Sequence, residues 1–401
     1  MSKKKKWLKF RHRAIRWVGL PFMNLYTRLR YRIRVQKHKE KRPYFIMMNH
    51  QTAFDQFFVE MAFSGPVYYV ASEDLFSKGW ISSVIRYVVA PIPIKKQVTD
   101  VNAVMNCIRV AREGGTIAIA PEGNRTYSGR TEYMNPAIAP LAKKLKLPIA
   151  LFRIEGGYGV HPRWSDVVRK GKMRAYVSRV IELEEYAAMS NEELLRAIQK
   201  ELYVDEGVAD GIFESSRKAE YLERAFYVCP HCGLSTFHSA GNEIECLKCH
   251  RKIAYGADKS LTGVGFSFPF QFTTQWYDYQ EAFINKLDVM QYSEEPLYRE
   301  RSGLTEIEVY KSRSLLRENA EIALYGDRLV VDAGAENELV LPFSQITAMS
   351  VLGRNKLNIY WEDHVYQLKS DKRFNALKYV NIYFRHRNMV RGEENAEFLG
   401  L

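Results

Sequence analysis

Short apolar segments alternate with helix-like segments from Lys41 to about residue 215, and this alternation limits the possible folds more than any other feature of the sequence. The apolar segments are 44–48, 67–70, 116–120 and 149–154. The stretches between them carry apolar residues at helical spacing, as in 101–111 and near 137–146. Such alternation is typical of an α/β domain with a largely parallel sheet.

Local signals predict where two helices of this region start and where its functional loops lie. A helix is expected from about Thr52, after the first apolar segment. Ser190 and Glu193 form a capping box, which predicts a helix that continues through Tyr203. Functional loops of a parallel sheet emerge at the carboxyl ends of its strands. Residues that follow the first and third apolar segments should therefore meet at one edge.

The bulk composition indicates several globular domains. A chain of 401 residues is too long for one ordinary domain. A hydrophobic share of 46% and a charged share of 26% are typical of globular proteins rather than disordered ones. Changes in composition divide the chain into five segments, which are 1–42, 43–222, 223–258, 259–300 and 301–401.

The segment 1–42 carries the basic charge of the chain. It contains sixteen Lys and Arg and one acid, Glu40, whereas the net charge of the whole chain is +13, so the rest sums to −2. Apolar and aromatic residues such as Trp17 and Phe22 lie between the cations. This mixture favours amphipathic helices in the headgroup region of an anionic membrane, with Pro21 separating two short helices. A solvated basic arm or an RNA-binding tail is the alternative.

No segment of the sequence is apolar and long enough to be expected to span a bilayer. Nor does a convincing secretory signal begin the chain, because Arg11, Arg13 and Arg16 interrupt any apolar stretch behind Lys3–Lys6. We therefore expect reducing surroundings and a peripheral position at the cytoplasmic face of a membrane.

Four of the five cysteines form two Cys-x-x-Cys pairs separated by thirteen residues: Cys229, Cys232, Cys246 and Cys249. This spacing predicts a zinc ribbon at 223–258, in which four thiolates hold a structural Zn²⁺. A redox pair and two disulfides are the alternatives, but no thioredoxin-like unit surrounds either pair. His231 and His250 are alternative ligands, although we expect them to be bystanders, and Cys107 is expected to be an inert core residue.

The last two segments are rich in aromatic and β-forming residues. In the connecting region 259–300, every second residue from Phe266 to Phe272 is Phe, which predicts a strand with one apolar face. Short β-like runs follow between 318 and 369, and a helix-like stretch spans 372–387. Antiparallel strands capped by one C-terminal helix are similar to a small β-barrel of the pleckstrin-homology or GRAM type, which we expect at 301–401.

His50 follows the first predicted strand, and Asp55 comes five residues later. Imidazole is the side chain whose ordinary pKa suits a general base near neutral pH, and a carboxylate on its other nitrogen fixes the tautomer. No serine nucleophile in a Gly-x-Ser-x-Gly turn is visible, so the substrate is expected to supply the hydroxyl. The alternative is a structural one, with Thr52 as a helix N-cap and Asp55 in the first helical turn.

A second polar run, PEGNR at 121–125, follows the third predicted strand. A glycine lets backbone amides approach a phosphate, and Arg125 can bind a phosphate through two nitrogens. The alternative interpretations are a polar turn between a strand and a helix, or a structural ion pair between Glu122 and Arg125.

Together, NHQTAFD at 49–55 and PEGNR at 121–125 resemble the glycerolipid acyltransferase family, which includes 1-acyl-glycerol-3-phosphate acyltransferases. APIPIKK at 90–96 and LPIALF at 147–152 are similar to two further blocks of that family. The resemblance covers about residues 20–215. Thr52 stands where Ser is usual, Asn124 where Thr is usual and Lys96 where Arg is common, and the last two leave the acceptor open.

The resemblance implies that 43–222 is an acyltransferase domain. Its reaction would move a fatty acyl group from acyl-CoA or acyl-carrier protein to the hydroxyl of a lysophosphatidic acid-type acceptor. In that reaction His50, oriented by Asp55, would act as the general base and no metal would be required. The residues that would hold the phosphorylated acceptor are Asn49, Lys96, Glu122, Gly123 and Arg125.

Two functions of other classes compete with this interpretation. One is a nucleic-acid-binding protein built from the zinc ribbon and the basic arm. We expect no nucleic-acid partner, because the ribbon is not notably basic and lies about two hundred residues from the arm. The other is a lipid-binding scaffold with an inactive acyltransferase domain, against which the presence of both His50 and Asp55 argues.

Overall fold

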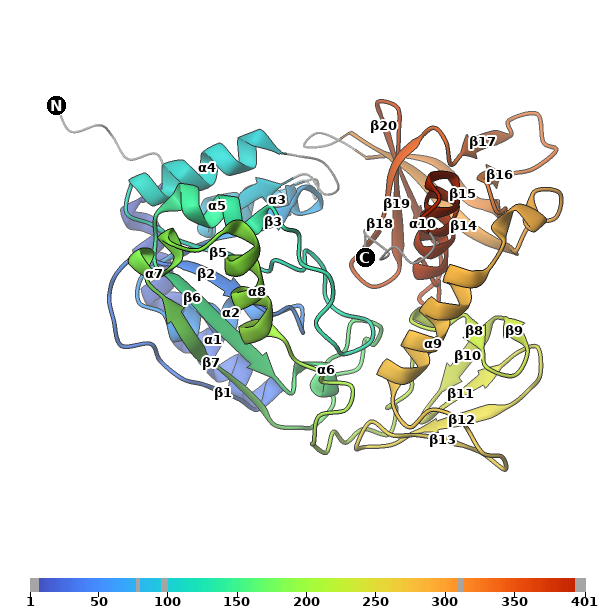
Figure 1. Ribbon diagram of the computed structural model, residues 1–401, viewed down its shortest axis with the longest axis horizontal. Helices are drawn as coiled ribbons and strands as arrows, with labels where there is room; N and C mark the ends of the chain where they lie inside the picture. Colours follow the sequence, from blue (N-terminus) through green and yellow to red (C-terminus); the bar gives the residue numbers. More distant parts are fainter. Residues whose placement is uncertain (1–6, 77–79, 95–99, 309–312, 394–401) are drawn as a thin grey trace. The chain divides into compact units, whose positions relative to one another are not determined.

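The computed structural model describes residues 7–76, 80–94, 100–308 and 313–393 (Figure 1). The chain divides into two compact units. The first comprises Met1–Arg163 and Val168–Glu214, and the second comprises Trp164–Val167 and Ser215–Leu401. The segments predicted as a cysteine module, a connecting region and a C-terminal β domain all belong to the second unit.

The first unit is built on a seven-stranded sheet in the order β1-β7-β6-β2-β5-β3-β4. Neighbouring strands are parallel except β6 and β7, which are antiparallel. The α/β class and the largely parallel sheet are therefore confirmed. The strands are β1 (Ile33–Val35), β2 (Phe45–Met48), β3 (Val67–Ser72), β4 (Ile92–Ile94), β5 (Thr116–Ile119), β6 (Ile149–Glu155) and β7 (Met173–Ile181).

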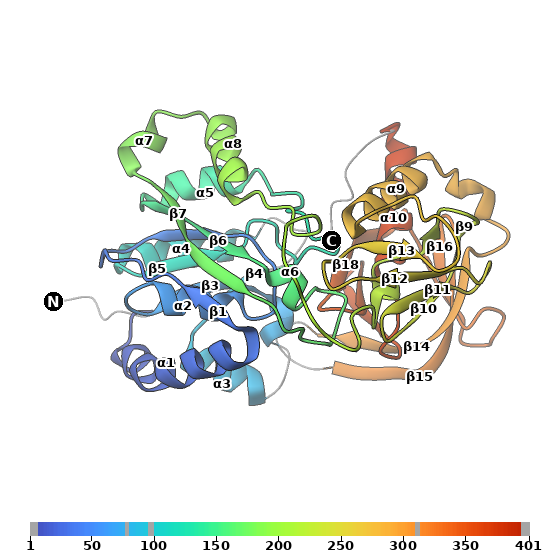
Figure 2. The ribbon, with the colours of Figure 1, turned by 90° about the horizontal axis from the view of Figure 1, so that it is seen from below.

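Helices cover both faces of this sheet (Figures 1 and 2). On one face, α1 (Phe10–Tyr31) and α2 (Asp55–Ala62) contribute to one apolar core. On the other face lie α4 (Val101–Arg112), α5 (Ile138–Leu145) and α8 (Asn191–Leu202), which share a second core. The remaining helices of the unit are η1 (Glu73–Phe76), α3 (Trp80–Val88), α6 (Gly157–Val160) and α7 (Leu183–Ala187).

The capping box of α8 is present, with Ser190 and Glu193 each bonded to the other's backbone nitrogen. Two other helix predictions are wrong in detail. The helix after β2 begins at Asp55 rather than near Thr52. Pro21 lies inside one continuous helix, α1, and does not divide it into two. Contacts with α2 on both sides of the proline hold α1 in place, because Arg16 bonds to Glu60 and Thr27 to Met61.

Within the described parts of the chain, every helix is too short or too polar to cross a lipid bilayer. Three strands of the first unit, β1, β4 and β7, were not predicted. The first two have only three residues each, and β7 interleaves Arg174 and Arg179 with its apolar residues. None of them therefore gives a clear apolar run.

The described residues of the second unit form three antiparallel sheets. A two-stranded sheet pairs β8 (Val228–Cys229) with β9 (Gly233–Leu234). A four-stranded sheet consists of β10 (Phe237–Ala240), β11 (Glu243–Cys246), β12 (Lys252–Tyr255) and β13 (Leu261–Gly263). Short 3-10 turns lie at η2 (Leu222–Arg224) and η3 (Val289–Tyr292).

The largest sheet of this unit has seven antiparallel strands in the order β17-β16-β15-β14-β20-β19-β18 and curls into an open half-barrel (Figure 1). The helix α10 (Leu377–Arg391) packs against β18. Its strands are β14 (Tyr298–Ile307), β15 (Arg313–Leu324), β16 (Arg328–Val331), β17 (Leu339–Pro342), β18 (Ile346–Leu352), β19 (Lys356–Trp361) and β20 (His364–Lys369).

The predicted strand from Phe266 to Phe272 is wrong. The structure assigns no strand to these residues and places a helix, α9 (Thr273–Lys286), directly after them. The Phe268 ring makes edge-to-face contacts with those of Phe266 and Phe270 instead, and it lies 5.2 Å from the ring of Trp276 in α9. Aromatic packing between neighbouring side chains thus produces the same alternation as a strand face.

The Phe213 ring packs directly against glycine residues in the core of the first unit. A Cβ added at Gly159 or Gly171 would overlap this ring. We expect Gly171→Ala to lower the free energy of unfolding by about 1–3 kcal/mol, because the core has no room for a methyl group there. Urea unfolding measures the loss, and Phe213→Leu in the same chain should restore part of it. Unfolding of Gly171→Ala at the wild-type midpoint would contradict this packing.

Candidate active site

The loop that follows β2 is fastened to the neighbouring strand β6 by Asn49. The Asn49 Nδ2 donates to the Ile154 carbonyl at 2.8 Å, and its Oδ1 accepts from the Ile154 amide at 2.7 Å. Both polar ends of this buried side chain therefore contact the backbone. In this structure Asn49 sets the position of the loop that carries His50.

The carboxylate of Asp55, the first residue of α2, accepts hydrogen bonds from other residues of this loop. The Asp55 Oδ2 accepts from the His50 Nδ1 at 2.8 Å and from the Gln51 amide at 2.7 Å. The Thr52 amide donates to both oxygens at 3.0 Å, and the Thr52 hydroxyl donates to Oδ1 at 2.7 Å. Every one of these partners can donate, which suits an ionised carboxylate. The anion also lies at the positive end of the α2 dipole.

This arrangement determines the tautomer of His50. An ionised carboxylate only accepts hydrogen bonds, so the proton of the neutral imidazole lies on Nδ1 and the lone pair on Nε2. The Asp55 side chain is fully buried, whereas the His50 side chain keeps 24% of its surface exposed. His50 is thus held by a buried anion and remains accessible from outside.

Glu122 joins this loop to the one that follows β5. Its Oε1 accepts from the His50 amide at 2.9 Å, and its Oε2 accepts from the Glu132 amide at 3.2 Å. The two runs found in the sequence therefore meet at one edge of the sheet. Burial raises the pKa of Glu122 to about 8, although the two backbone donors act in the opposite direction.

The remaining residues of the second run lie in the turn after β5. Gly123 has a positive φ of 71°, and a Cβ added there would meet no atom within 4 Å. Arg125 is half-buried, and its carbonyl accepts from the Arg163 Nη1 at 2.8 Å. Lys96, the predicted basic residue of the second block, lies outside the described residues.

Sequence reasoning did not identify two parts of this site. The Thr52 hydroxyl bonds to Asp55 and accepts from the Phe54 amide at 3.1 Å, so it shapes the turn without being the N-cap, which is Phe54. Glu132 accepts from the hydroxyls of Thr126 and Ser128, and its amide contacts Glu122. Isolated polar residues of this kind give no periodic signal.

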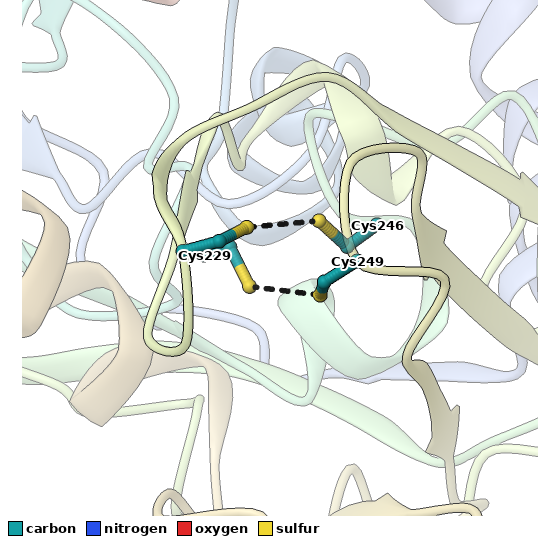
Figure 3. Close-up of side chains that lie close together, drawn as sticks. Cys229, Cys246 and Cys249 are labelled. Atoms are coloured by element: carbon teal, nitrogen blue, oxygen red, sulfur yellow. Dashed lines mark hydrogen bonds between the residues drawn. The ribbon is translucent and has the colours of Figure 1, made fainter.

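The four cysteines of the second unit form one cluster (Figure 3). Their sulfur atoms all lie within 4.8 Å of one another, with Cys229 and Cys249 3.8 Å apart and Cys232 and Cys246 3.6 Å apart. Sulfurs bound tetrahedrally to Zn²⁺ at 2.3 Å would be about 3.8 Å apart, so the donor set fits this ion. His250 bonds to Glu245 at 3.0 Å.

Glu122 should make the stability of the protein depend on pH. Its pKa is raised from an ordinary 4.5 to about 8, so folding favours the protonated carboxyl. The resulting stabilisation is complete below pH 4.5 and is lost as the pH rises through about 8. Relative to Glu122→Gln, the wild-type melting temperature should therefore fall between about pH 5 and about pH 9. Melting curves that stay parallel over this range would contradict the assignment, and the exposed Glu184→Gln serves as the control.

Comparisons with known proteins match part of the first unit to one family. The family model described as Acyltransferase matches residues 30–154. Among solved structures, the chain is similar to the 1-acyl-sn-glycerophosphate (LPA) acyltransferase PlsC from Thermotoga maritima, with 19% identity, a TM-score of 0.40, and coverage of 48% of this chain and 80% of that one. No curated protein matches the sequence. Residues 30–154, which contain His50, Asp55 and Glu122, thus match the acyltransferase family.

Proposed function

We propose that this protein is a glycerolipid O-acyltransferase that transfers a fatty acyl group from acyl-CoA or acyl-carrier protein to the hydroxyl of a lysophosphatidic acid-type acceptor. The observation that carries the proposal is the contact of His50 with both motifs. Its Nδ1 bonds to Asp55 and its amide to Glu122, within the segment that matches the acyltransferase family.

In the proposed reaction the Nε2 of His50 takes the proton of the acceptor hydroxyl as its oxygen attacks the thioester carbonyl. The new C–O bond forms, the C–S bond breaks, and the imidazolium returns the proton to the departing thiolate. Asp55 stabilises the imidazolium, as the carboxylate of a hydrolase triad does. The reaction requires neither a nucleophile from the protein nor a metal.

Arg125 and the backbone at Gly123 supply the groups that suit the acceptor phosphate. An arginine can bind two phosphate oxygens at once, and the open space beside Gly123 lets a ligand approach the backbone. Asn49 and Glu122 were also predicted to bind substrate. Because their polar atoms bond to the backbone, we assign them a positioning role instead. Lys96 remains a predicted phosphate ligand.

His50→Ala should lower the rate of acyl transfer by about 10²–10⁴-fold, because a general base contributes that much to such reactions. The measurement is product formation from acyl-CoA and lysophosphatidic acid, followed by mass spectrometry. The exposed His238→Ala is the matched control and should retain the wild-type rate. A folded His50→Ala variant that transfers acyl groups at the wild-type rate would overturn the mechanism.

We also propose that α1 contacts an anionic lipid surface at the cytoplasmic face of the membrane. This helix packs Leu20, Met23 and Tyr31 against the core of the first unit, yet it also exposes large apolar side chains. Its His12 and Thr27 are buried, and the Arg16 guanidinium bonds to Glu60 and to the Phe63 carbonyl. Its exposed apolar residues are Phe10, Trp17, Val18, Phe22, Leu25, Tyr26 and Leu29.

For the second unit we propose a structural Zn²⁺ held by the four cysteines, which would leave no open position for chemistry. Native mass spectrometry should find one zinc per chain, and Cys229→Ser should lose it and lower the melting temperature of this unit. His231→Ala should keep the metal, because its side chain is expected to be a bystander. Zinc loss in His231→Ala, or a zinc-free wild type purified without chelator, would contradict the four-cysteine site.

A further inference from the structure

A second helix of the first unit, α3, likewise exposes large apolar side chains. In α3 the side chains of Trp80 and Tyr87 are 76% and 57% exposed, and Val84 is exposed between them. The small polar Ser82 is buried instead, and its hydroxyl donates to the Leu75 carbonyl at 2.8 Å. Among the described residues, these large apolar side chains of α3 are thus left largely exposed to solvent.

The two helices adjoin one another. The Arg11 guanidinium of α1 lies over the Tyr87 ring of α3, 4.2 Å from its centroid. Figure 2 shows α1 and α3 side by side, with α8 beyond the sheet on its other side. The exposed residues of α1 and α3 therefore belong to neighbouring surfaces of the same unit.

The charges carried by these two segments favour an anionic partner. No Asp or Glu occurs between Trp7 and Lys39 or between Trp80 and Ile94. Exposed cations accompany the apolar residues, among them Arg13, Arg28 and Arg86. A second copy of this chain would place cations against cations, whereas anionic headgroups would neutralise them. Aromatic rings flanked by cations are typical of the boundary between headgroups and acyl chains.

We propose that α3 is a second lipid-contacting element, and that α1 and α3 together dock the acyltransferase unit on an anionic bilayer. The proposal rests on the proposed function, because the acceptor assigned there is a membrane lipid. A single helix in the headgroup region leaves the protein free to roll about the helix axis. A second contact beside it prevents that rotation and fixes which side of the unit faces the lipid.

Side chains of α1 also contact the turn between β2 and α2, which carries His50. The rings of Tyr26 and Tyr31 in α1 lie 6.1 Å and 5.1 Å from that of Phe54, which immediately precedes Asp55. A fixed orientation of α1 and α3 on the bilayer would therefore also fix the orientation of the His50 loop. We expect α3 to contribute most to acyl transfer when the acceptor is embedded in a membrane.

The test compares Trp80→Ser/Tyr87→Ser with the wild type by sedimentation with vesicles of equal parts phosphatidylcholine and phosphatidylglycerol. Loss of two interfacial aromatic rings should weaken partitioning about tenfold or more, as should Trp17→Ser/Phe22→Ser in α1. The matched control is Tyr203→Ser, which removes an exposed aromatic ring at the end of α8 and should bind as the wild type does.

Wild-type partitioning of the α3 variant, beside a loss in the α1 variant, would overturn the proposal. So would a changed oligomeric state of the α3 variant in light scattering, which would assign the surface to a second copy.

Acyl transfer to a monomeric short-chain lysophosphatidic acid, without vesicles, should stay at the wild-type rate in the α3 variant. A lower rate there would assign α3 to the substrate site. Absence of transfer in the wild type itself would remove the proposed function while leaving the vesicle result unaffected.

Discussion

The carboxylate of Asp55 is the interaction on which the candidate site depends. It receives hydrogen bonds from the His50 ring, the Gln51 amide and both donors of Thr52, so a single buried anion shapes the whole turn between β2 and α2. Its burial would be costly without these donors. The same bonds that stabilise the anion also give His50 its tautomer and its orientation.

Two further acids, the buried Glu122 and the partly buried Glu60, link other parts of the unit to this turn and to α2. Glu122 fastens the His50 loop to the loop after β5, and burial raises its pKa. Glu60 of α2 accepts from Arg16 of α1, and burial raises its pKa as well. Since α2 also begins with Asp55, the proposed lipid-contacting helix and the proposed base are attached to the same short helix. The helix α2 would then hold both the proposed lipid-contacting helix α1 and the proposed base His50 in position.

The sequence predicted those features that arise from repeating patterns. Four apolar runs predicted the strands β2, β3, β5 and β6. Because functional loops lie at the carboxyl ends of parallel strands, the sequence also predicted that His50 and Glu122 lie close together. Features that depend on tertiary contacts were missed or wrong. The helix α1 continues through Pro21 and contacts α2 on both sides of it, and the phenylalanines before α9 make ring contacts with one another without forming a strand. Bonds from Glu122 to distant backbone amides leave no pattern in the sequence.

The central claim is that Asp55 fixes the tautomer of His50, the proposed general base. The protonation of the two His50 ring nitrogens tests this claim most directly. Nitrogen-15 chemical shifts of the labelled protein near neutral pH distinguish the two tautomers, and His50→Ala identifies the signals. We predict a protonated Nδ1 and an unprotonated Nε2, and Asp55→Ala should abolish this preference because the acceptor of the Nδ1 proton is lost. A neutral ring with its proton on Nε2 in the wild-type protein would contradict the role of Asp55 and of His50 as the general base.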